Sequence, residues 1–287
     1  MFYWILYMEL TNHMRINAFE DNVIALLSTK SDGDMRLTGH EQYDGEAYAR
    51  RGTFLRQYEI DPDSVLSAEL MHGNHGRIVD NLARGKNIRV PKVDILVTTQ
   101  KNVPLSVSVA DCFPVYLHDP VRGAIGLLHA GWKGVSVSED GETVISSAIN
   151  LMKCADCDPK NIVAHVGPGI QECCFEVGKS VYDKFKGFSH VRNIPVPIPG
   201  VDPDSEITHE YVKKYYVDLR SAIEFHLRHA GLQEYNISSD RKCTRCYKGL
   251  TKLNPLPEKS VIEYQFFSAR RDKTTPIQSQ MAVIVCR

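Results

Sequence analysis

Short, almost continuously apolar runs recur through the middle of the chain and again near its end. They are VDILVTT (93–99), PLSVSVA (104–110), FPVYL (113–117), GAIGLLH (123–129), NIVAHV (161–166), VIEYQFF (261–267) and MAVIVC (281–286). Apolar runs of this length are typical of strands that are buried on both faces. The pattern therefore predicts a set of buried strands. The apolar stretch MFYWILYMEL (1–10) is predicted to be a first strand.

Helical periodicity appears between these runs. It predicts helices over 142–153 and 177–185. The longest is predicted over 209–230, where six apolar residues recur at helical spacing before Gly231 supplies a stop: Tyr211, Tyr215, Leu219, Ala222, Ile223 and Leu227. The segment 191–206 contains four prolines and is predicted to be an ordered surface loop or lid. Strands mixed with helices indicate an α/β or α+β layered domain.

Composition narrows the choice of partner. The chain has 34 basic and 35 acidic residues with 43% hydrophobic content, so it carries no basic surplus that would indicate nucleic-acid binding. The apolar start is shorter than the roughly 18 residues that span a bilayer, and it lacks the basic leader of a secretion signal. We therefore expect a cytoplasmic protein with reduced cysteines, no membrane contact and a small-molecule partner.

The runs at 113–117 and 123–129 flank an Asp-Pro turn and predict an antiparallel hairpin. A two-residue turn at Pro120 and Val121 would place Cys112 opposite His129, with β-carbons about 4.5–5.5 Å apart. Such a pair can share a metal ion or a proton. A bulge at Gly123 would instead put the two side chains on opposite faces, and a purely structural Cys and His remain the alternative.

Two neighbouring motifs strengthen the functional interpretation of this pair. The small residues after His129, in AGWKG (130–134), can start a helix whose amides face an anion. His72 lies in LMHGNHG (70–76) and would be a third ligand, which gives zinc three protein ligands and an open fourth position. Asp111 either orients a ligand histidine or caps the turn.

The remaining cysteine and glycine motifs carry less weight. CADC (154–157) and CTRC (243–246) are separated by the 85 residues of 158–242, far more than in a common zinc knuckle, so a shared zinc is not favoured. The pair CC (173–174) is interpreted as packing, and GPGI (167–170) as a tight turn rather than a phosphate nest.

Seven motifs in order along the chain resemble one family. They are MHG (71–73), ADCFPVYL (110–117), HAGWKG (129–134), GPGIQECCFEV (167–177), DLR (218–220), CTRC (243–246) and FFSARRD (266–272). Together they resemble the laccase-domain family, which is variously described as multicopper polyphenol oxidase-like and as purine nucleoside phosphorylase. The resemblance extends from about Asn22 to the C-terminus.

The resemblance implies an α/β layered sandwich of two mixed β-sheets with helices packed outside, formed by residues 1–287 as a single domain. It also implies a catalytic zinc site whose ligands are His72, Cys112 and His129, with His75 as an alternative to His72. Zinc is favoured over copper, because oxidising copper centres require several clustered histidines and usually a Met.

The resemblance further implies phosphorolysis of adenosine, inosine, guanosine and methylthioadenosine with inorganic phosphate, together with adenosine deamination. Arg270, Arg271 and Lys133 are candidates for phosphate or substrate contacts, although an ion pair with Asp272 is a structural alternative for the arginines. The chain departs from the family pattern at 28–34, Leu70 and Ala269, which leaves substrate orientation open.

Three other functions stay open at this stage. In one, Cys112 is a thiolate nucleophile with His129 as its base, and the protein is an amidase that edits a peptidoglycan precursor. In the others, the protein is a phenol-oxidising copper protein, or a scaffold whose metal site is structural and closed by four ligands.

Overall fold

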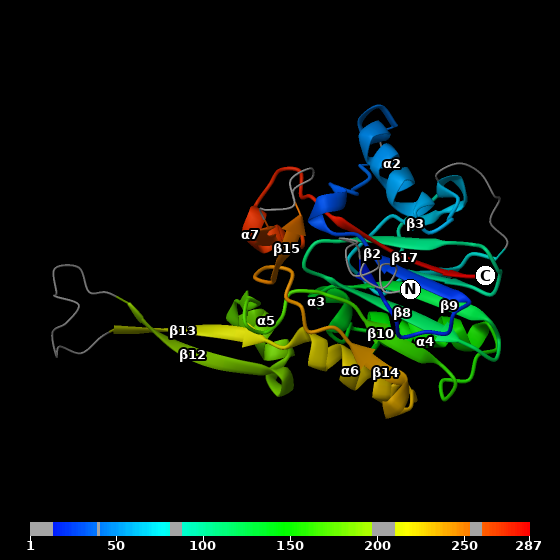
Figure 1. Cartoon of the computed structure of the whole chain (residues 1–287). Helices are drawn as coiled ribbons and strands as arrows, with labels where there is room; N and C mark the ends of the chain where they lie inside the picture. Colours follow the sequence, from blue (N-terminus) through cyan, green and yellow to red (C-terminus); the bar gives the residue numbers. More distant parts are fainter. Residues whose placement is uncertain (1–13, 39–40, 81–87, 197–209, 253–259) are drawn as a thin grey trace, which may run out of the picture.

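The computed structural model describes residues 14–38, 41–80, 88–196, 210–252 and 260–287. Within these residues two six-stranded mixed sheets lie face to face (Figure 1). Sheet A has the order β1 (Met14–Arg15), β2 (Val23–Leu27), β17 (Gln280–Cys286), β7 (Leu105–Val109), β3 (Leu66–Ala68) and β5 (Arg89–Val90). Sheet B has the order β14 (Ile237–Ser239), β10 (Val163–Val166), β8 (Phe113–Asp119), β9 (Ala124–Ala130), β6 (Ile95–Thr98) and β4 (Gly76–Ile78).

The layer between the sheets is filled by alternate residues of the central strands. In β17, Ala282 and Ile284 face sheet B, while Met281 and Val283 face the other way. Tyr116 of β8 is fully buried in this layer, and its hydroxyl donates to the carbonyl oxygen of Leu26 at 2.9 Å. Strands that bury both faces have few polar positions, which explains their continuous apolar sequence.

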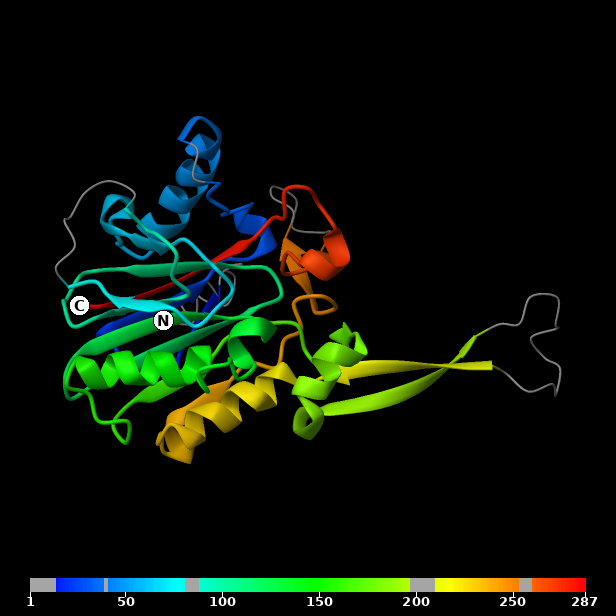
Figure 2. The same cartoon turned by 180° about the vertical axis from the view of Figure 1, so that it is seen from behind.

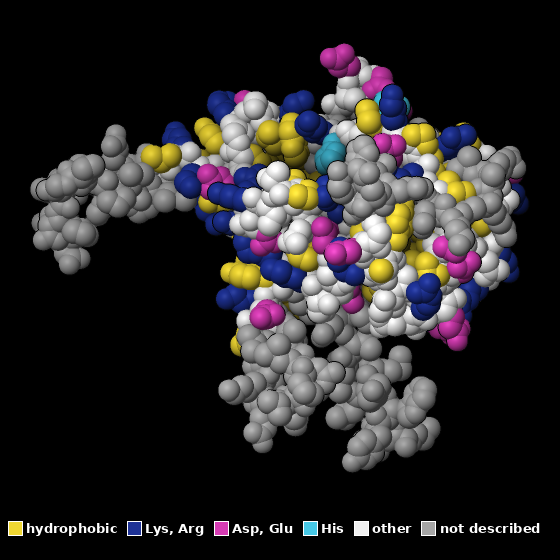
Figure 3. Space-filling view, turned by 90° about the horizontal axis from the view of Figure 1, so that it is seen from above, with side chains coloured by type: hydrophobic (Ala, Val, Ile, Leu, Met, Phe, Trp, Pro, Cys, Tyr) yellow, Lys and Arg dark blue, Asp and Glu magenta, His cyan; other side chains and the backbone are white. Residues whose placement is uncertain are grey.

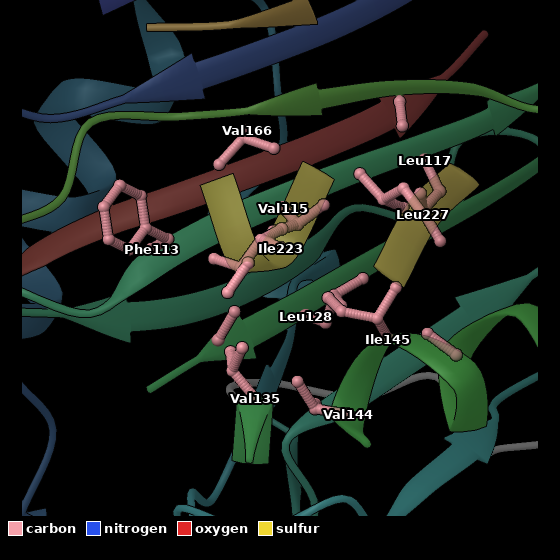
Figure 4. Packing of buried hydrophobic residues seen from close by; sticks show 14 of the residues in the cluster. Phe113, Val115, Leu117, Leu128, Val135, Val144, Ile145, Val166, Ile223 and Leu227 are labelled. Atoms are coloured by element: carbon pink, nitrogen blue, oxygen red, sulfur yellow. The ribbon is translucent and has the colours of Figure 1, made fainter. Parts of the chain in front are cut away.

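Helices cover the outer faces of both sheets. Helix α2 (Glu41–Arg56) packs Phe54 and Leu55 on the outer face of sheet A. Helices α4 (Val144–Cys154) and α6 (Leu219–His229) cover the outer face of sheet B (Figure 2). Figure 4 shows this second core, where Ile145 of α4 and Ile223 of α6 pack against the strands. The predicted sandwich of two mixed sheets with helices outside is confirmed.

The helix predicted over 209–230 is wrong in its first half. Residues Glu210–Val217 form strand β13, which pairs antiparallel with β12 (Ser189–Val196), and α6 begins only at Leu219. The Asp218 side chain accepts a hydrogen bond from the backbone of Ser221, and this N-cap fixes the helix start. Residues 191–196, predicted as loop, belong to β12, and 197–206 lie outside the described residues. Figure 1 shows the hairpin projecting from the sandwich.

The other predicted elements are largely confirmed. The helices over 142–153 and 177–185 correspond to α4 and α5 (Lys179–Lys184). The strand predicted over 261–267 is shorter, because β16 (Ser260–Tyr264) ends at Tyr264, which pairs with Lys248, the first residue of its antiparallel partner β15 (Lys248–Lys252). The strand predicted over 1–10 lies outside the described residues.

The described residues also contain several short elements: β11 (Glu176–Val177), α3 (Trp132–Val135), α7 (Ala269–Asp272), η1 (Lys30–Asp32), η2 (Pro62–Ser64), η3 (Lys186–Phe188) and η4 (Glu234–Asn236).

No helix in the described ranges combines the length and apolar character needed to cross a membrane.

Candidate metal centre

The register of the β8–β9 hairpin differs from the predicted one. Pro114, not Cys112, lies opposite His129. The turn contains four residues instead of two, because Asp119 Oδ1 accepts backbone hydrogen bonds from Val121 and Arg122. Gly123 then closes the loop with a φ of 66°, which glycine adopts without strain. The predicted pairing was therefore wrong by two residues.

A shift of two residues keeps a side chain on the same face of a strand. His129 therefore still belongs to the face of β9 that points into the layer between the sheets, next to Leu127. Cys112 precedes β8 and extends this pairing opposite Gly131, where a β-carbon would lie only 3.0 Å from Cys112 Sγ. The glycine in HAGWKG thus leaves room for the thiol, and the hairpin still brings Cys112 and His129 together.

His72 completes a cluster of three side chains with metal-ligand chemistry. One ligand atom each from His72, Cys112 and His129 lies within 4.8 Å of the others. The two imidazole rings meet edge to face with centroids 4.7 Å apart. His129 is buried, Cys112 is half-buried and His72 is exposed, so the cluster opens on one side. His75 is outside this cluster, and its backbone carbonyl instead accepts hydrogen bonds from Asp94 and Ile95.

A single buried carboxylate holds two of these residues. Asp94, fully buried at the start of β6, accepts the Nδ1 proton of His129 at 2.9 Å. It also accepts backbone hydrogen bonds from Met71, His72 and Gly73 at 3.2, 3.0 and 2.8 Å. These bonds stabilise His72 in the left-handed region, with a φ of 59°. Asp94 therefore orients the His129 ring and fixes the loop that carries His72.

Charge in the metal-free cluster is set by the same neighbours. Burial lowers the pKa of His129, but Cys112 and the hydrogen-bonded Asp94 more than offset this and raise it to about 10. The pKa of His72 is lowered by burial and by the positive charge of His129. At neutral pH the metal-free site therefore holds a protonated His129 and a neutral His72.

Asp111, the other acid considered in the sequence, does not contact either histidine of the cluster. It accepts hydrogen bonds from Thr244 Oγ1 at 2.7 Å, Ser268 Oγ at 3.0 Å and the backbone of Arg270 at 2.7 Å. Its φ of 82° is unusual for a side-chain-bearing residue and turns the chain sharply before Cys112. Asp111 thus ties the Cys112 turn to α7.

A cavity of about 770 Å³ adjoins the cluster and is lined by His72, Cys112 and His129. Leu70 and Ala269, two departures from the family pattern, also line it. Figure 3 shows Lys and Arg side chains around hydrophobic side chains on the face that carries α2 and α7, with a histidine beside them. A cavity of this size accommodates a nucleoside-sized ligand.

Arg51 is a buried cation on the wall of this cavity that the sequence did not reveal. It is 5% exposed and donates to Met35 O at 2.7 Å, Ser67 Oγ at 3.1 Å and Ser108 Oγ at 3.0 Å. Burial lowers its pKa to about 10, so the guanidinium stays charged at neutral pH. Arg36 also lines the cavity, and its buried Nε has no hydrogen-bond partner. These two side chains place positive charge on one wall of the cavity.

The three basic residues selected from the sequence lie apart from this wall. Arg270 lines a neighbouring cavity of about 300 Å³ together with Cys112 and Trp132, and donates to Glu176 O at 2.7 Å. The Arg271 side chain bonds Asp272 and three backbone carbonyls, those of Thr244, Arg245 and Phe266. Lys133 is exposed and lines neither cavity.

The donor set fits a metal ion that prefers nitrogen and sulfur. Two imidazoles and a thiol converge, Asp94 fixes Nδ1 of His129 and leaves its Nε2 as the ligand atom, and Gly131 leaves space beside the sulfur. Three protein ligands leave a position for water or substrate, as in catalytic zinc sites.

Replacing Asp94 with asparagine should lower zinc affinity about 10–100-fold, because the negative charge that supports His129 is lost. Competition with a chromogenic chelator measures this. Asp80→Asn is the matched control, since Asp80 accepts similar hydrogen bonds from Thr98 and Thr99 away from the cluster. Equal zinc affinity of the Asp94 variant and wild type would contradict the assigned role of Asp94.

Zinc affinity should rise roughly tenfold per pH unit between about pH 7 and 9. The pKa of His129 in the metal-free protein is about 10, so metal binding must release its proton, and a higher pH favours that release. Zinc titrations with a competing chelator at several pH values give the slope. A pH-independent affinity over this range would contradict the release of a proton from His129 on metal binding.

Comparison with known proteins adds independent information. Residues 37–287 match the family described as multi-copper polyphenol oxidoreductase laccase. The chain is 28% identical over 270 residues to purine nucleoside phosphorylase YlmD of Bacillus subtilis, which covers 90% of this chain and 86% of that protein. It is 29% identical over 202 residues to adenosine deaminase RL5 from an unknown prokaryotic organism, covering 68% and 71% of the two chains.

The fold is also similar to a solved structure. The crystal structure of YlmD from Geobacillus stearothermophilus superimposes with a TM-score of 0.73 at 26% identity, over 95% of this chain and 94% of that one.

Proposed function

Because the chain belongs to the multi-copper polyphenol oxidoreductase laccase family, we propose that it is a zinc-containing purine nucleoside phosphorylase that also deaminates adenosine. The observation that carries the proposal is the convergence of His72, Cys112 and His129 on the wall of a cavity that also holds the buried cation Arg51. The names of two similar proteins, a purine nucleoside phosphorylase and an adenosine deaminase, support the same pair of reactions.

The proposed substrates are adenosine, inosine, guanosine and methylthioadenosine, with inorganic phosphate as the second substrate. We assign the nucleoside to the 770 Å³ cavity, where Trp132 supplies an aromatic surface for the purine. We also propose that residues 1–287 form one domain, because in the described residues both faces of each sheet are covered within the same sandwich.

In phosphorolysis, a phosphate oxygen forms a bond to the anomeric carbon of the sugar as the bond from that carbon to the purine nitrogen breaks. The products are the free base and the sugar 1-phosphate. Arg51 holds the phosphate, because three hydrogen bonds to protein groups fix its guanidinium and leave two N–H donors for an oxyanion. Arg36, which lines the same cavity, adds positive charge, whereas Arg89 on that wall is paired with Glu69 at 3.8 Å.

In deamination, water adds to the purine carbon that bears the amino group, and ammonia leaves to give inosine. His72, Cys112 and His129 would hold the zinc ion. When bound, zinc supplies a Lewis acid that makes water a better nucleophile near neutral pH. Asp94 keeps the His129 ring in the orientation needed for this, and the buried side of the cluster limits access of bulk water.

Chromatography of the purified protein incubated with adenosine, with and without phosphate, tests the proposal. We expect adenine and ribose 1-phosphate when phosphate is present and inosine when it is absent. Elemental analysis of the same sample should show zinc, and Cys112→Ala should lose it from this site. Neither product from a zinc-loaded protein would refute the proposal.

A second candidate rests on the hydrogen bond between Cys112 and His129. In the metal-free protein this pair resembles a thiolate and its base, which would suit amide hydrolysis. Zinc and a substrate amide then compete for the same sulfur. If adding zinc to the metal-free protein inhibits amide hydrolysis and does not restore deamination, the amidase is correct.

A further inference from the structure

Four cysteines outside the candidate active site form a second cluster. Cys173 and Cys174 lie in the loop after β10, and Cys243 and Cys246 lie after β14. All four sulfur atoms are within 4.8 Å of one another. The parallel pairing of β10 with β14 brings the two segments together, and an isolated bridge between Gly169 and Cys243 continues it. CTRC therefore meets CC and not CADC, the other motif of the same spacing.

The distances suit a shared metal ion. Cys173 Sγ lies 3.6 Å from Cys174 Sγ and 3.7 Å from Cys246 Sγ. Four sulfurs at the usual zinc–sulfur distance of about 2.3 Å stand about 3.8 Å apart in a tetrahedron. A disulfide, by contrast, requires sulfurs about 2.05 Å apart, and all four cysteines are free.

Hydrogen-bond donors surround the sulfurs. The backbone N–H of Gln171 donates to Cys243 Sγ at 3.4 Å, and those of Cys246 and Arg245 donate to the same sulfur. The Arg245 side chain donates to Cys174. Amide donors from within a Cys-x-x-Cys segment, together with a nearby guanidinium, offset the negative charge of a site made of several thiolates.

We propose that Cys173, Cys174, Cys243 and Cys246 bind a structural zinc ion that is distinct from the His72–Cys112–His129 site. Four protein sulfurs close the coordination shell and leave no position for water, which is the arrangement of structural zinc sites. Two of the ligands are buried and two are exposed, so the ion would lie under the surface of the loop pair and zinc can enter from solvent.

The proposed ion would fix the wall of the neighbouring cavity. Thr244, between two of the ligands, donates to Asp111, and its carbonyl accepts from Arg271 of α7. Phe175, next to Cys174, lines the 300 Å³ cavity with Cys112. The tetrathiolate ion would therefore hold both the Asp111 turn and α7 in place, so its role is positional.

Zinc content measured in the Cys112→Ala background separates the two sites. Cys112→Ala should retain about one equivalent of zinc after dialysis, and adding Cys243→Ser and Cys246→Ser should remove it. Cys154→Ser is the matched control, because Cys154 is an exposed cysteine of the other Cys-x-x-Cys motif, and it should leave the zinc content unchanged. This comparison does not depend on whether the first site binds metal or on the proposed reaction.

Two measurements on protein with all four cysteines cover the case in which the serine variants do not fold. Cobalt bound to Cys112→Ala should show the absorption of a tetrathiolate site. In the zinc-loaded protein, an alkylating agent should modify Cys154 but spare the four cluster cysteines until a chelator is added. The proposal is overturned if Cys112→Ala binds no zinc, if the cluster reacts as fast as Cys154, or if mass spectrometry finds a Cys173–Cys246 disulfide in protein purified with reductant.

Discussion

Replacing Cys112 with alanine should abolish zinc binding at the His72 and His129 site and reduce adenosine deamination by about 10³-fold or more. Losing the only sulfur ligand leaves two imidazoles, which hold zinc too weakly to keep it in place. The Lewis acid contributes several kcal/mol to such reactions, and each 1.4 kcal/mol corresponds to about tenfold in rate. Steady-state rates and zinc content of the same preparation measure the effect.

The substitution removes little else, which makes the result interpretable. Cys112 is half-buried, and alanine fits the space that Gly131 leaves beside the sulfur. Cys154→Ser again serves as the control and should match wild type in rate. Full activity of Cys112→Ala in either reaction would show that this reaction does not use the cluster.

The Arg51→Met variant should raise the KM for phosphate about 100-fold and leave deamination, which needs no phosphate, unchanged. Two hydrogen bonds from a charged donor, at about 1.5 kcal/mol each, account for this factor. The free energy of unfolding should also fall by about 1–3 kcal/mol, because Met35 O and Ser67 lose a donor in a buried setting. Phosphate titrations and urea denaturation measure the two effects separately.

Arg56→Met is the matched control on the same helix, because Arg56 is exposed and does not line the cavity. It should change neither the KM for phosphate nor the free energy of unfolding by much. If Arg51→Met lost phosphorolysis and deamination equally, Arg51 would support the fold of the site and not bind phosphate.

The fold could be predicted where a strand is buried on both faces. The runs in β6 to β9 and β17 are nearly all apolar. Each run is also too short to form a typical helix between its flanking turns. The prediction for the region around Tyr211 and Leu219 was wrong for a specific reason. Apolar residues there happen to keep helical spacing across the junction between β13 and α6, while the local signal for the junction, the N-cap Asp218, is a single residue.

The candidate site could also be predicted from the sequence only in part. The motifs around His72, Cys112 and His129 indicated which side chains would meet, but the register that brings them together depends on a four-residue turn that the Asp-Pro pair does not specify. Asp94 lies inside the apolar run 93–99, where a carboxylate could have been identified as a buried partner. Arg51 gave no such signal, because one arginine among several in a polar helix becomes buried only through packing on sheet A.

Pairing of the cysteine motifs could not be deduced from spacing. Cys243 meets Cys173 because two strands far apart in the sequence, β10 and β14, lie side by side in sheet B. CADC and CTRC have the same internal spacing but lie in different parts of the fold. Only the order of strands in the sheet decides which segments meet.

The position of β17 has a consequence for biosynthesis. This strand comes after all the other described strands, yet it lies between β2 and β7 in the middle of sheet A. Until β17 has been synthesised, the edges of β2 and β7 that pair with it stay exposed. The part of sheet A on which α2 packs is then incomplete. Nascent chains that stall before Gln280 would therefore present two open strand edges, which makes them targets for chaperones and prone to aggregate.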